Sequence, residues 1–349
     1  MPVIYWLTWG WKPCHNVLSS RDPTMNRVNP PVTTVLLARR SQALKRHLAE
    51  AAAGNGVGVH QARVASRRLR EAVPVLATGL KDSKADKARR KIRRITGALG
   101  AIRELDVTVA LIDDLVKREG VPRLALEDVR AYVMKEQERR REVMLKRLGR
   151  VNVDKLDKRL TSLAETLEQA GTDDWREALS KRLLKRSKAL REAVADAGQL
   201  YEAERLHMVR IAAKKLRYAA EVAAETGVKA ATHVVRTIKR VQDTLGRLHD
   251  VQVLQTHVAA VQAQPPRASG AQGGLDIISR QLEEECRHLH ARYLATVGAL
   301  QAAIDDIQAV VAPQVARRRK SRGPLKMKLS SSAARAASVS KASVGTSHR

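Results

Sequence analysis

Two similar stretches, VHQARVASRRLREA at residues 59–72 and LHMVRIAAKKLRYA at residues 206–219, decide the fold class of this chain. His, Arg, Ala and Leu recur in both at matching positions, and Arg67 and Arg68 are answered by Lys214 and Lys215. A second pair follows, KIRRITGALGAIREL at residues 91–105 and TIKRVQDTLGRLHDV at residues 237–251. The offset between partners is 147 residues in the first pair and 146 in the second. Two pairs in the same order at nearly one spacing predict an internal duplication.

The composition favours helix along most of the chain. Hydrophobic residues make up 44% of it, yet aromatic residues only 3%, with no Phe. The core must therefore be built from Ala, Leu and Val, among many Arg, Lys, Glu and Gln, which is a helix-forming mixture. We predict an all-α fold whose halves pair around a pseudo-twofold axis. Apolar periodicity predicts helices over residues 32–53, 59–79, 84–118, 122–149, 153–170, 174–197, 200–226, 229–262 and 275–311.

The chain divides into three predicted regions. Residues 1–31 form an extension that we expect to be disordered, unless Met25 is the true start. Residues 32–311 form the helical domain, with one repeat over about 32–150 and the other over about 174–311. Residues 312–349 carry ten Lys and Arg and no acid, which predicts a disordered basic tail.

The charge balance points to an anionic partner. Sixty-five Lys and Arg against 36 Asp and Glu leave a net charge of +29. Without the ten basic residues of the tail the remainder is still +19, so the helical domain is basic in its own right. Such an excess attracts anionic polymers or anionic membrane surfaces. No run of about 18 apolar residues is present, so we expect no membrane span.

The cysteines indicate a reducing compartment. Cys14 and Cys286 are the two in the chain, and neither belongs to a CxxC pair. This argues against a disulfide scaffold and against a structural zinc site. We predict a cytoplasmic protein.

The basic residues of each repeat share one side of a helix. At about 100° per residue, His60, Arg63, Arg67 and Arg70 fall within an arc of about 80°, opposite the apolar positions. His207, Arg210, Lys214 and Arg217 take the same places in the second repeat. Like charges at this spacing repel by a few tenths of a kcal/mol per pair. A sequence built only for stability would alternate them with Glu, so we interpret both stripes as a binding surface. The next helix of each half continues the pattern with Lys84, Lys87, Lys91 and Arg94, and with Arg236, Lys239, Arg240 and Arg247.

These blocks resemble the signature of the CHAD family, the conserved histidine α-helical domain. The matching residues are VHQARVASRRLR at 59–70, LGAIRELDV at 99–107, LHMVRIAAKKLRY at 206–218 and LGRLHDV at 245–251. The resemblance implies two four-helix bundles around a pseudo-twofold axis. It also implies binding of inorganic polyphosphate by His, Arg and Lys on the basic surface and in a central groove.

The resemblance and the charge pattern together give a set of predicted polyphosphate-binding residues: His60, Arg63, Arg67, Arg68, Arg70, Lys91, Arg94, His207, Arg210, Lys214, Lys215, Arg217 and Arg240. We expect the two histidines to donate hydrogen bonds, to a phosphate or to a core carbonyl. An older suggestion for the family, metal chelation by its histidines, we consider the weaker interpretation, because neither has a nearby Cys or carboxylate pair. We interpret Glu104 and Asp250 as acids that orient neighbouring arginines. A symmetric role for Asp106 is doubtful because the second half has Gln252 at that position.

The predicted function is non-catalytic binding of polyphosphate, without cofactor or metal, in the cytoplasm and in association with polyphosphate granules. No ExExK motif of a triphosphate tunnel domain is present, so the chain is similar to stand-alone members of the family. Three alternatives stay open. One is nucleic-acid binding, aided by the basic tail, and another is a metal-dependent phosphohydrolase, for which no DxD, P-loop or GxSxG motif is found. The third is a structural scaffold.

Overall fold

The computed structural model describes residues 31–80, 83–170, 174–264 and 269–321. Over these ranges the regular structure is all helix, as predicted. The predicted extension at residues 1–30 and most of the predicted tail, residues 322–349, lie outside the described residues. The eleven helices are α1 (Val32–Ala52), α2 (Gly56–Leu76), α3 (Ser83–Ala98), α4 (Gly100–Leu115), α5 (Arg123–Gly149), α6 (Val153–Ala170), α7 (Asp174–Ala197), α8 (Ala203–Glu225), α9 (Lys229–Gln262), α10 (Ser269–Leu294) and α11 (Val297–Ser321).

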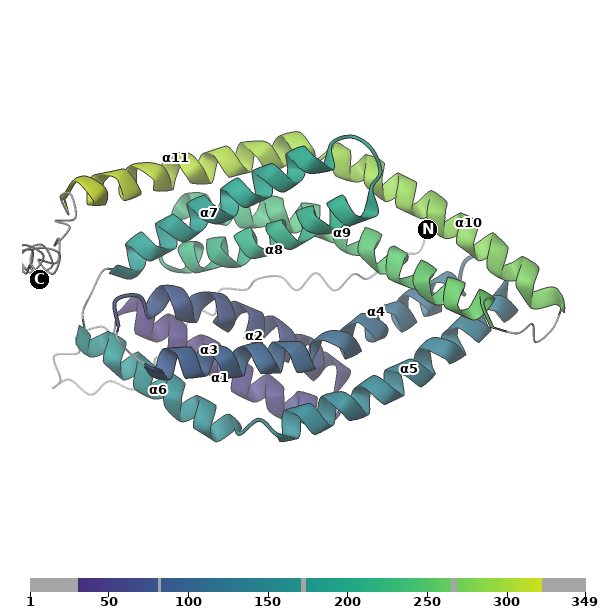
Figure 1. Cartoon of the computed structure of the whole chain (residues 1–349), viewed down its shortest axis with the longest axis horizontal. Helices are drawn as coiled ribbons and strands as arrows, with labels where there is room; N and C mark the ends of the chain where they lie inside the picture. The colour runs from purple at the N-terminus through teal and green to yellow at the C-terminus, as the bar shows by residue number, and fades with distance from the viewer. Residues whose placement is uncertain (1–30, 81–82, 171–173, 265–268, 322–349) are drawn as a thin grey trace, which may run out of the picture. The chain divides into compact units, whose positions relative to one another are not determined.

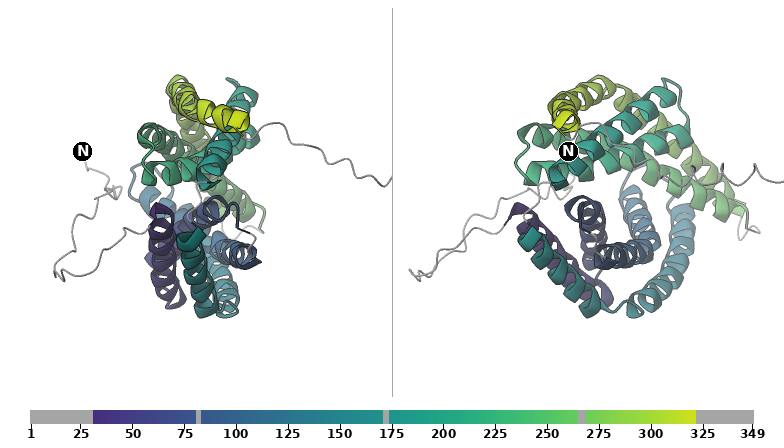
Figure 2. Two further views of the ribbon diagram at one scale, coloured as in Figure 1. Left: turned by 90° about the vertical axis from the view of Figure 1, so that its left-hand side faces the viewer. Right: turned by 60° about the vertical axis from the view of Figure 1, so that its left-hand side comes forward.

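Each half of the helical domain contributes a ring of four packed helices. In the first half α1 contacts α2 and α6, and α3 completes the ring by contacting α2 and α6. In the second half α7, α8, α9 and α11 make the same succession of contacts. The first ring lies in the lower part of Figure 1 and the second in the upper part, and Figure 2 shows both from two further sides. All eleven helices belong to one compact unit.

A third set of helices joins the two rings. Helices α4 and α5 of the first half pack against α9 and α10 of the second, and these four converge at the right of Figure 1. In the two repeats, α4 corresponds to the last part of α9, and α5 corresponds to α10. This arrangement is consistent with the predicted duplication.

Two predicted helices are each divided in two. The helix expected over residues 84–118 is α3 and α4, separated at Leu99, whereas α9 continues without a break through the matching stretch of the second repeat. The carbonyl of Gly100 accepts a hydrogen bond from a guanidinium nitrogen of Arg63 (3.2 Å), a contact from another helix. The helix expected over residues 275–311 is α10 and α11, bent by 43° between Leu294 and Val297. At both sites the apolar residues stay in step across the break, so periodicity does not reveal it.

Several helix ends also differ from the prediction; α10, for example, begins at Ser269 rather than at residue 275. Helix α2 begins at Gly56 rather than at residue 59, because the Asn55 side chain caps it by accepting from the Val57 and Gly58 amides at 2.8 and 3.1 Å. A Cβ at Gly58 would lie 2.5 Å from the Cβ of Glu50, so the glycine permits close packing of α1 on α2. Helix α11 continues to Ser321, past the predicted start of the disordered tail at residue 312.

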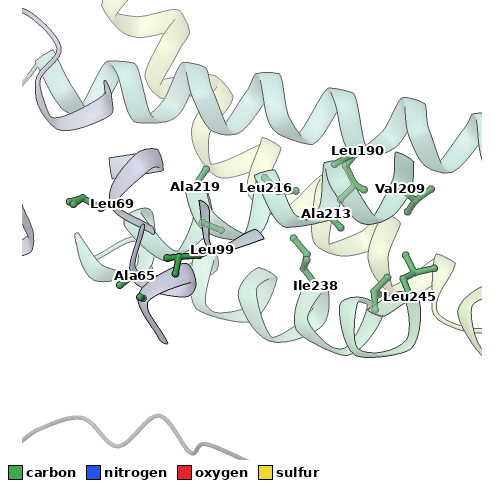
Figure 3. Close-up of a cluster of buried hydrophobic side chains, with 14 of the residues drawn as sticks. Ala65, Leu69, Leu99, Leu190, Val209, Ala213, Leu216, Ala219, Ile238 and Leu245 are labelled. Carbon is green, nitrogen blue, oxygen red and sulfur yellow. The ribbon is translucent and has the colours of Figure 1, made fainter. Parts of the chain in front are cut away.

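The buried apolar side chains form one cluster that runs through both halves. Figure 3 shows Ala65, Leu69 and Leu99 of the first half beside Leu190, Leu216 and other side chains of the second. None of the described helices is by itself both long and apolar enough to cross a membrane. The bent pair Gly273–Leu294 and Val297–Pro313 meets that test of length and composition only when both helices are counted together.

Ion pairs join the halves in both directions. Arg68 of α2 donates to Glu221 of α8 at 2.9 Å, and Arg40 of α1 donates to Glu225 of α8 at 2.7 Å. In the other direction, Arg182 of α7 donates to Glu71 of α2. Acids of the second helix in each half are thus occupied by arginines of the other half.

Replacing Glu221 by Ala is expected to lower the free energy of unfolding by about 2–3 kcal/mol. Only 9% of this side chain is exposed, and it accepts from Arg68 and from Arg217 (2.6 Å), which would both lose their partner. Urea denaturation measures the change. Glu192→Ala is the control, because its pair with Lys188 is exposed on both sides and is worth at most about 0.5 kcal/mol. Equal midpoints for the two variants would contradict a stabilising role for the pairs between the halves.

Candidate functional site

Four basic side chains meet where α2 packs against α8. Arg63 and Arg67 come from α2, and Arg210 and Lys214 from α8. The charges of all three arginines lower the pKa of Lys214, and the charge of Arg67 also lowers the pKa values of Arg63 and Arg210. All four are only partly exposed. We call them the central cluster.

The positive charges of the central cluster repel one another and are partly removed from water. Burial, followed by the charges of Arg210, Arg67 and Arg63, lowers the pKa of Lys214 from 10.5 to about 7. Burial and the charge of Arg67 lower the pKa of Arg63 to about 10. Burial also lowers the pKa of Arg210. Desolvation and repulsion between like charges both act against the charged forms, so an anion placed here would relieve them.

Hydrogen-bonding capacity in the cluster is left unused. The buried Nε atoms of Arg67 and Arg210 have no partner among the described residues. Arg63 makes one contact, to the Gly100 carbonyl. A guanidinium has five N–H donors, so the three arginines retain most of theirs for a ligand.

Two acids lie beside the cluster and only partly balance it. Asp250 of α9 acts on Arg210 and Lys214, and burial raises its own pKa. Glu104 of α4 acts on Arg63 and Arg210. The side chain closest to its carboxylate is the ring of His249, at 4.0 Å, rather than an arginine. Two carboxylates thus stand against four cations.

Histidines border the cluster on both sides. Burial, with Arg103 and Arg63, lowers the pKa of His60 to about 4. Burial, with Arg210 and His207, does the same for His249. The rings of His207 and His249 lie 5.0 Å apart. His60 and His249 are therefore neutral near pH 7, where each ring retains one N–H donor. Over the described ranges, no three His, Cys, Asp or Glu side chains come together as a metal-binding group.

His249 is a site residue that the sequence-based set omitted. It occupies the position of Arg103 in the second repeat, within LGRLHDV. The signal that could have found it was the pairing of the repeats itself, which aligns His249 with a basic residue. Arg103 is likewise partly buried and acts on His60.

Two predicted residues lie outside the cluster because an acid occupies them. Arg68 and Arg217 both bind Glu221. Arg217 also lies over the ring of Tyr218, 4.7 Å from its centroid. Arg68 thus joins α2 to α8, whereas the contacts of Arg217 lie within α8.

The remaining predicted residues lie further out. Arg70 is exposed and lies near Arg67 and Arg93. Lys91 donates to the Asn152 carbonyl at 2.8 Å. Arg94, Lys215 and Arg240 are exposed. The structure thus brings together Arg63, Arg67, Arg210 and Lys214, with His60 and His207 beside them, and leaves the other seven elsewhere.

Comparison with known proteins agrees with this architecture. The CHAD domain family model matches residues 35–259. The crystal structure of the CHAD domain from the plant Ricinus communis superposes with a TM-score of 0.58 at 20% identity, covering 78% of this chain and 90% of that one. PptA from Streptomyces chartreusis gives a TM-score of 0.56 at 15% identity, covering 76% of this chain and 98% of that one. No curated protein matches the sequence. Since the family model covers well over half of its residues, the chain belongs to the CHAD domain family.

Proposed function

We propose that this protein binds inorganic polyphosphate at the central cluster and does so without catalysis. The observation that carries the proposal is the meeting of Arg63, Arg67, Arg210 and Lys214, partly buried, with only two acids nearby. Stability alone would not favour this arrangement, because desolvated like charges repel. A polyanion gains most where such charges are already assembled, since little reorganisation is needed on binding.

The kind of cation suits phosphate. Guanidinium groups donate two parallel hydrogen bonds to phosphate oxygens, and an ammonium group acts as a point charge. Polyphosphate has neither bases nor sugars, so it needs a line of such groups and no surface for stacking. The family resemblance supports the same ligand.

Single-stranded nucleic acid is the main competitor. Binders of that class place aromatic side chains beside basic ones, so that bases can stack. Tyr218 lies close enough to act on Arg63 and Arg210, but it is only 9% exposed and Arg217 lies over its ring. It therefore offers no face to a base, which favours polyphosphate over RNA or DNA.

The full-length protein is expected to bind long-chain polyphosphate more tightly than single-stranded RNA of equal charge at every salt concentration. Its logarithmic affinity should fall with the logarithm of salt concentration, because counterions are released as phosphates are neutralised. Fluorescence competition across a salt series measures both affinities. Equal affinities for the two polymers would overturn the assignment to polyphosphate.

The same samples test the catalytic alternative. Incubation with polyphosphate and Mg²⁺ or Mn²⁺, followed by assay of free phosphate, is expected to show no release above the level without protein. Release that depends on protein concentration would favour a phosphohydrolase instead.

A further inference from the structure

Helix α3 presents an almost continuous basic surface next to the central cluster. Its sequence, SKADKARRKIRRITGA, holds seven Lys and Arg and one acid. That acid, Asp86, pairs with Arg89 at 3.7 Å. At about 100° per residue, the other basic residues follow one another around the exposed half of the helix. In that order they are Arg93, Arg90, Arg94, Lys87, Lys91 and Lys84, and Lys84 donates a hydrogen bond to Ser162 of α6 at 2.8 Å.

One edge of this surface connects to the central cluster. Arg70 of α2 lies near Arg67 of the cluster and near Arg93 of α3. Both Arg70 and Arg93 are exposed, and α2 packs against α3. An anionic chain bound to Arg67 can therefore pass to α3 by way of Arg70. The acid next to this path is already bound by an arginine, so it does not repel the chain strongly. Glu71, the acid beside Arg70, is occupied by Arg182 of α7.

The other edge connects to α6. Lys91 reaches the Asn152 carbonyl just before α6 begins, and Lys155, Arg159 and Arg94 all act on it. Four cations from two packed helices thus meet at this edge. Two acids lie near the start of α6: Asp157 is bound by Lys45 at 2.7 Å, and Asp154 also acts on Lys45. We call Arg70, Arg93, Arg94, Lys91, Lys155 and Arg159 the lateral track.

Over the described residues, the second half keeps only part of the lateral track. Lys239 and Arg240 match Arg93 and Arg94, but the connections at both edges are missing. Arg217, which corresponds to Arg70, is bound to Glu221. Lys91 is answered by Thr237, a buried residue, and Asp243 lies near Lys239 and Arg217. Helix α11, which takes the place of α6, has no basic residue from Val297 to Pro313 and carries Asp305 and Asp306. The repeats therefore match at the centre but differ at the periphery.

We propose that a long polyphosphate chain leaves the central cluster on one side only, over α3 and onto α6 along the lateral track. The inference rests on the proposed function and adds a second binding region with a direction. It distinguishes ligands by length. A short oligophosphate is held by the central cluster alone, whereas a long chain occupies both regions.

The test compares three full-length variants with the parent, each carrying three changes from a basic residue to Glu. The lateral variant changes Arg93, Lys155 and Arg159. The counterpart variant changes Lys229, Arg236 and Lys239 on α9. The control variant changes Lys185, Lys188 and Arg280, which are exposed on α7 and α10. Circular dichroism confirms that each is helical, and affinities are measured for tripolyphosphate and for long-chain polyphosphate.

We expect the lateral variant to lose about tenfold or more in affinity for the long chain, with a shallower salt dependence, and to bind tripolyphosphate like the control. If the lateral and control variants bind the long chain alike, the lateral track is wrong while the central site stands. An equal loss in the counterpart variant overturns the one-sidedness. If the parent protein binds neither ligand, the proposed function itself fails, and the lateral track with it.

Discussion

Changing Arg63, Arg67, Arg210 and Lys214 together to Glu is expected to weaken binding of long-chain polyphosphate by at least about 100-fold. Each change removes a charge-assisted hydrogen bond to phosphate and replaces it with repulsion in a partly desolvated site. The slope of logarithmic affinity against logarithmic salt concentration should fall by about three to four, one counterion for each lost contact. Competition with labelled polyphosphate over a salt series measures both quantities.

The matched control keeps the same change in net charge but places it elsewhere. It changes four exposed basic residues outside both the central cluster and the lateral track, namely Arg139, Lys146, Lys185 and Arg280, to Glu. General attraction to a basic protein predicts equal losses in the two variants, whereas a localised site predicts a small loss in the control. A parent-like affinity in the central variant, with helix content retained, would refute the central cluster as the site.

The second prediction concerns Lys214→Met, which should stabilise the protein while weakening its function. Met fills a similar volume without a charge, so desolvation and repulsion by Arg63, Arg67 and Arg210 no longer act at this position. We expect the melting temperature without polyphosphate to rise by about 2 °C or more. Affinity for polyphosphate near pH 7 should fall by about tenfold, since one cation is lost. Thermal denaturation and titration on the same sample measure the two effects.

The dependence on pH follows from the direction of the shift. The pKa of Lys214 is lowered to about 7 from 10.5. Between these values the unfolded chain binds more protons than the folded one, so Lys214 makes the free energy of unfolding rise as pH rises from about 7 towards 10.5. Bound phosphate raises this pKa, so binding takes up a proton, and affinity for polyphosphate should fall as pH rises above about 7.

Lys215→Met is the control for the pH dependence, because it removes a lysine without removing Lys214. Lys215 is the exposed neighbour of Lys214 on α8, and its replacement should leave the fall of affinity with pH in place. Lys214→Met should flatten that fall over the same range. His60 and His249, with pKa values of about 4, stay neutral there and do not contribute. A steep fall that persists in Lys214→Met would assign the proton to another group.

The sequence by itself determined the helical class, the presence of repeated blocks and which side of α2 and α8 is basic. All three are local properties: the periodicity of Leu69 or Leu216 with their neighbours specifies a buried side, and that places Arg63 and Arg210 opposite. It did not show which helix faces which, because periodicity describes one helix at a time. Arg68 and Arg67 are adjacent in sequence, yet Arg68 binds Glu221, 153 residues away, while the buried Nε of Arg67 has no hydrogen-bond partner in the part of the chain that the structure describes.

The tertiary structure decided the composition of the site. Packing of α2 against α8 assembles the central cluster from two halves of the chain, and α9 adds His249 and Asp250 to it. In the first half α3 packs against α6, which carries Lys155 and Arg159, whereas in the second half α11, which takes the place of α6, carries acids. This difference makes the two halves unequal. The physical reason is that burial and repulsion depend on distances between helices. A stripe of charges on one helix becomes a site only when another helix of the same charge lies against it.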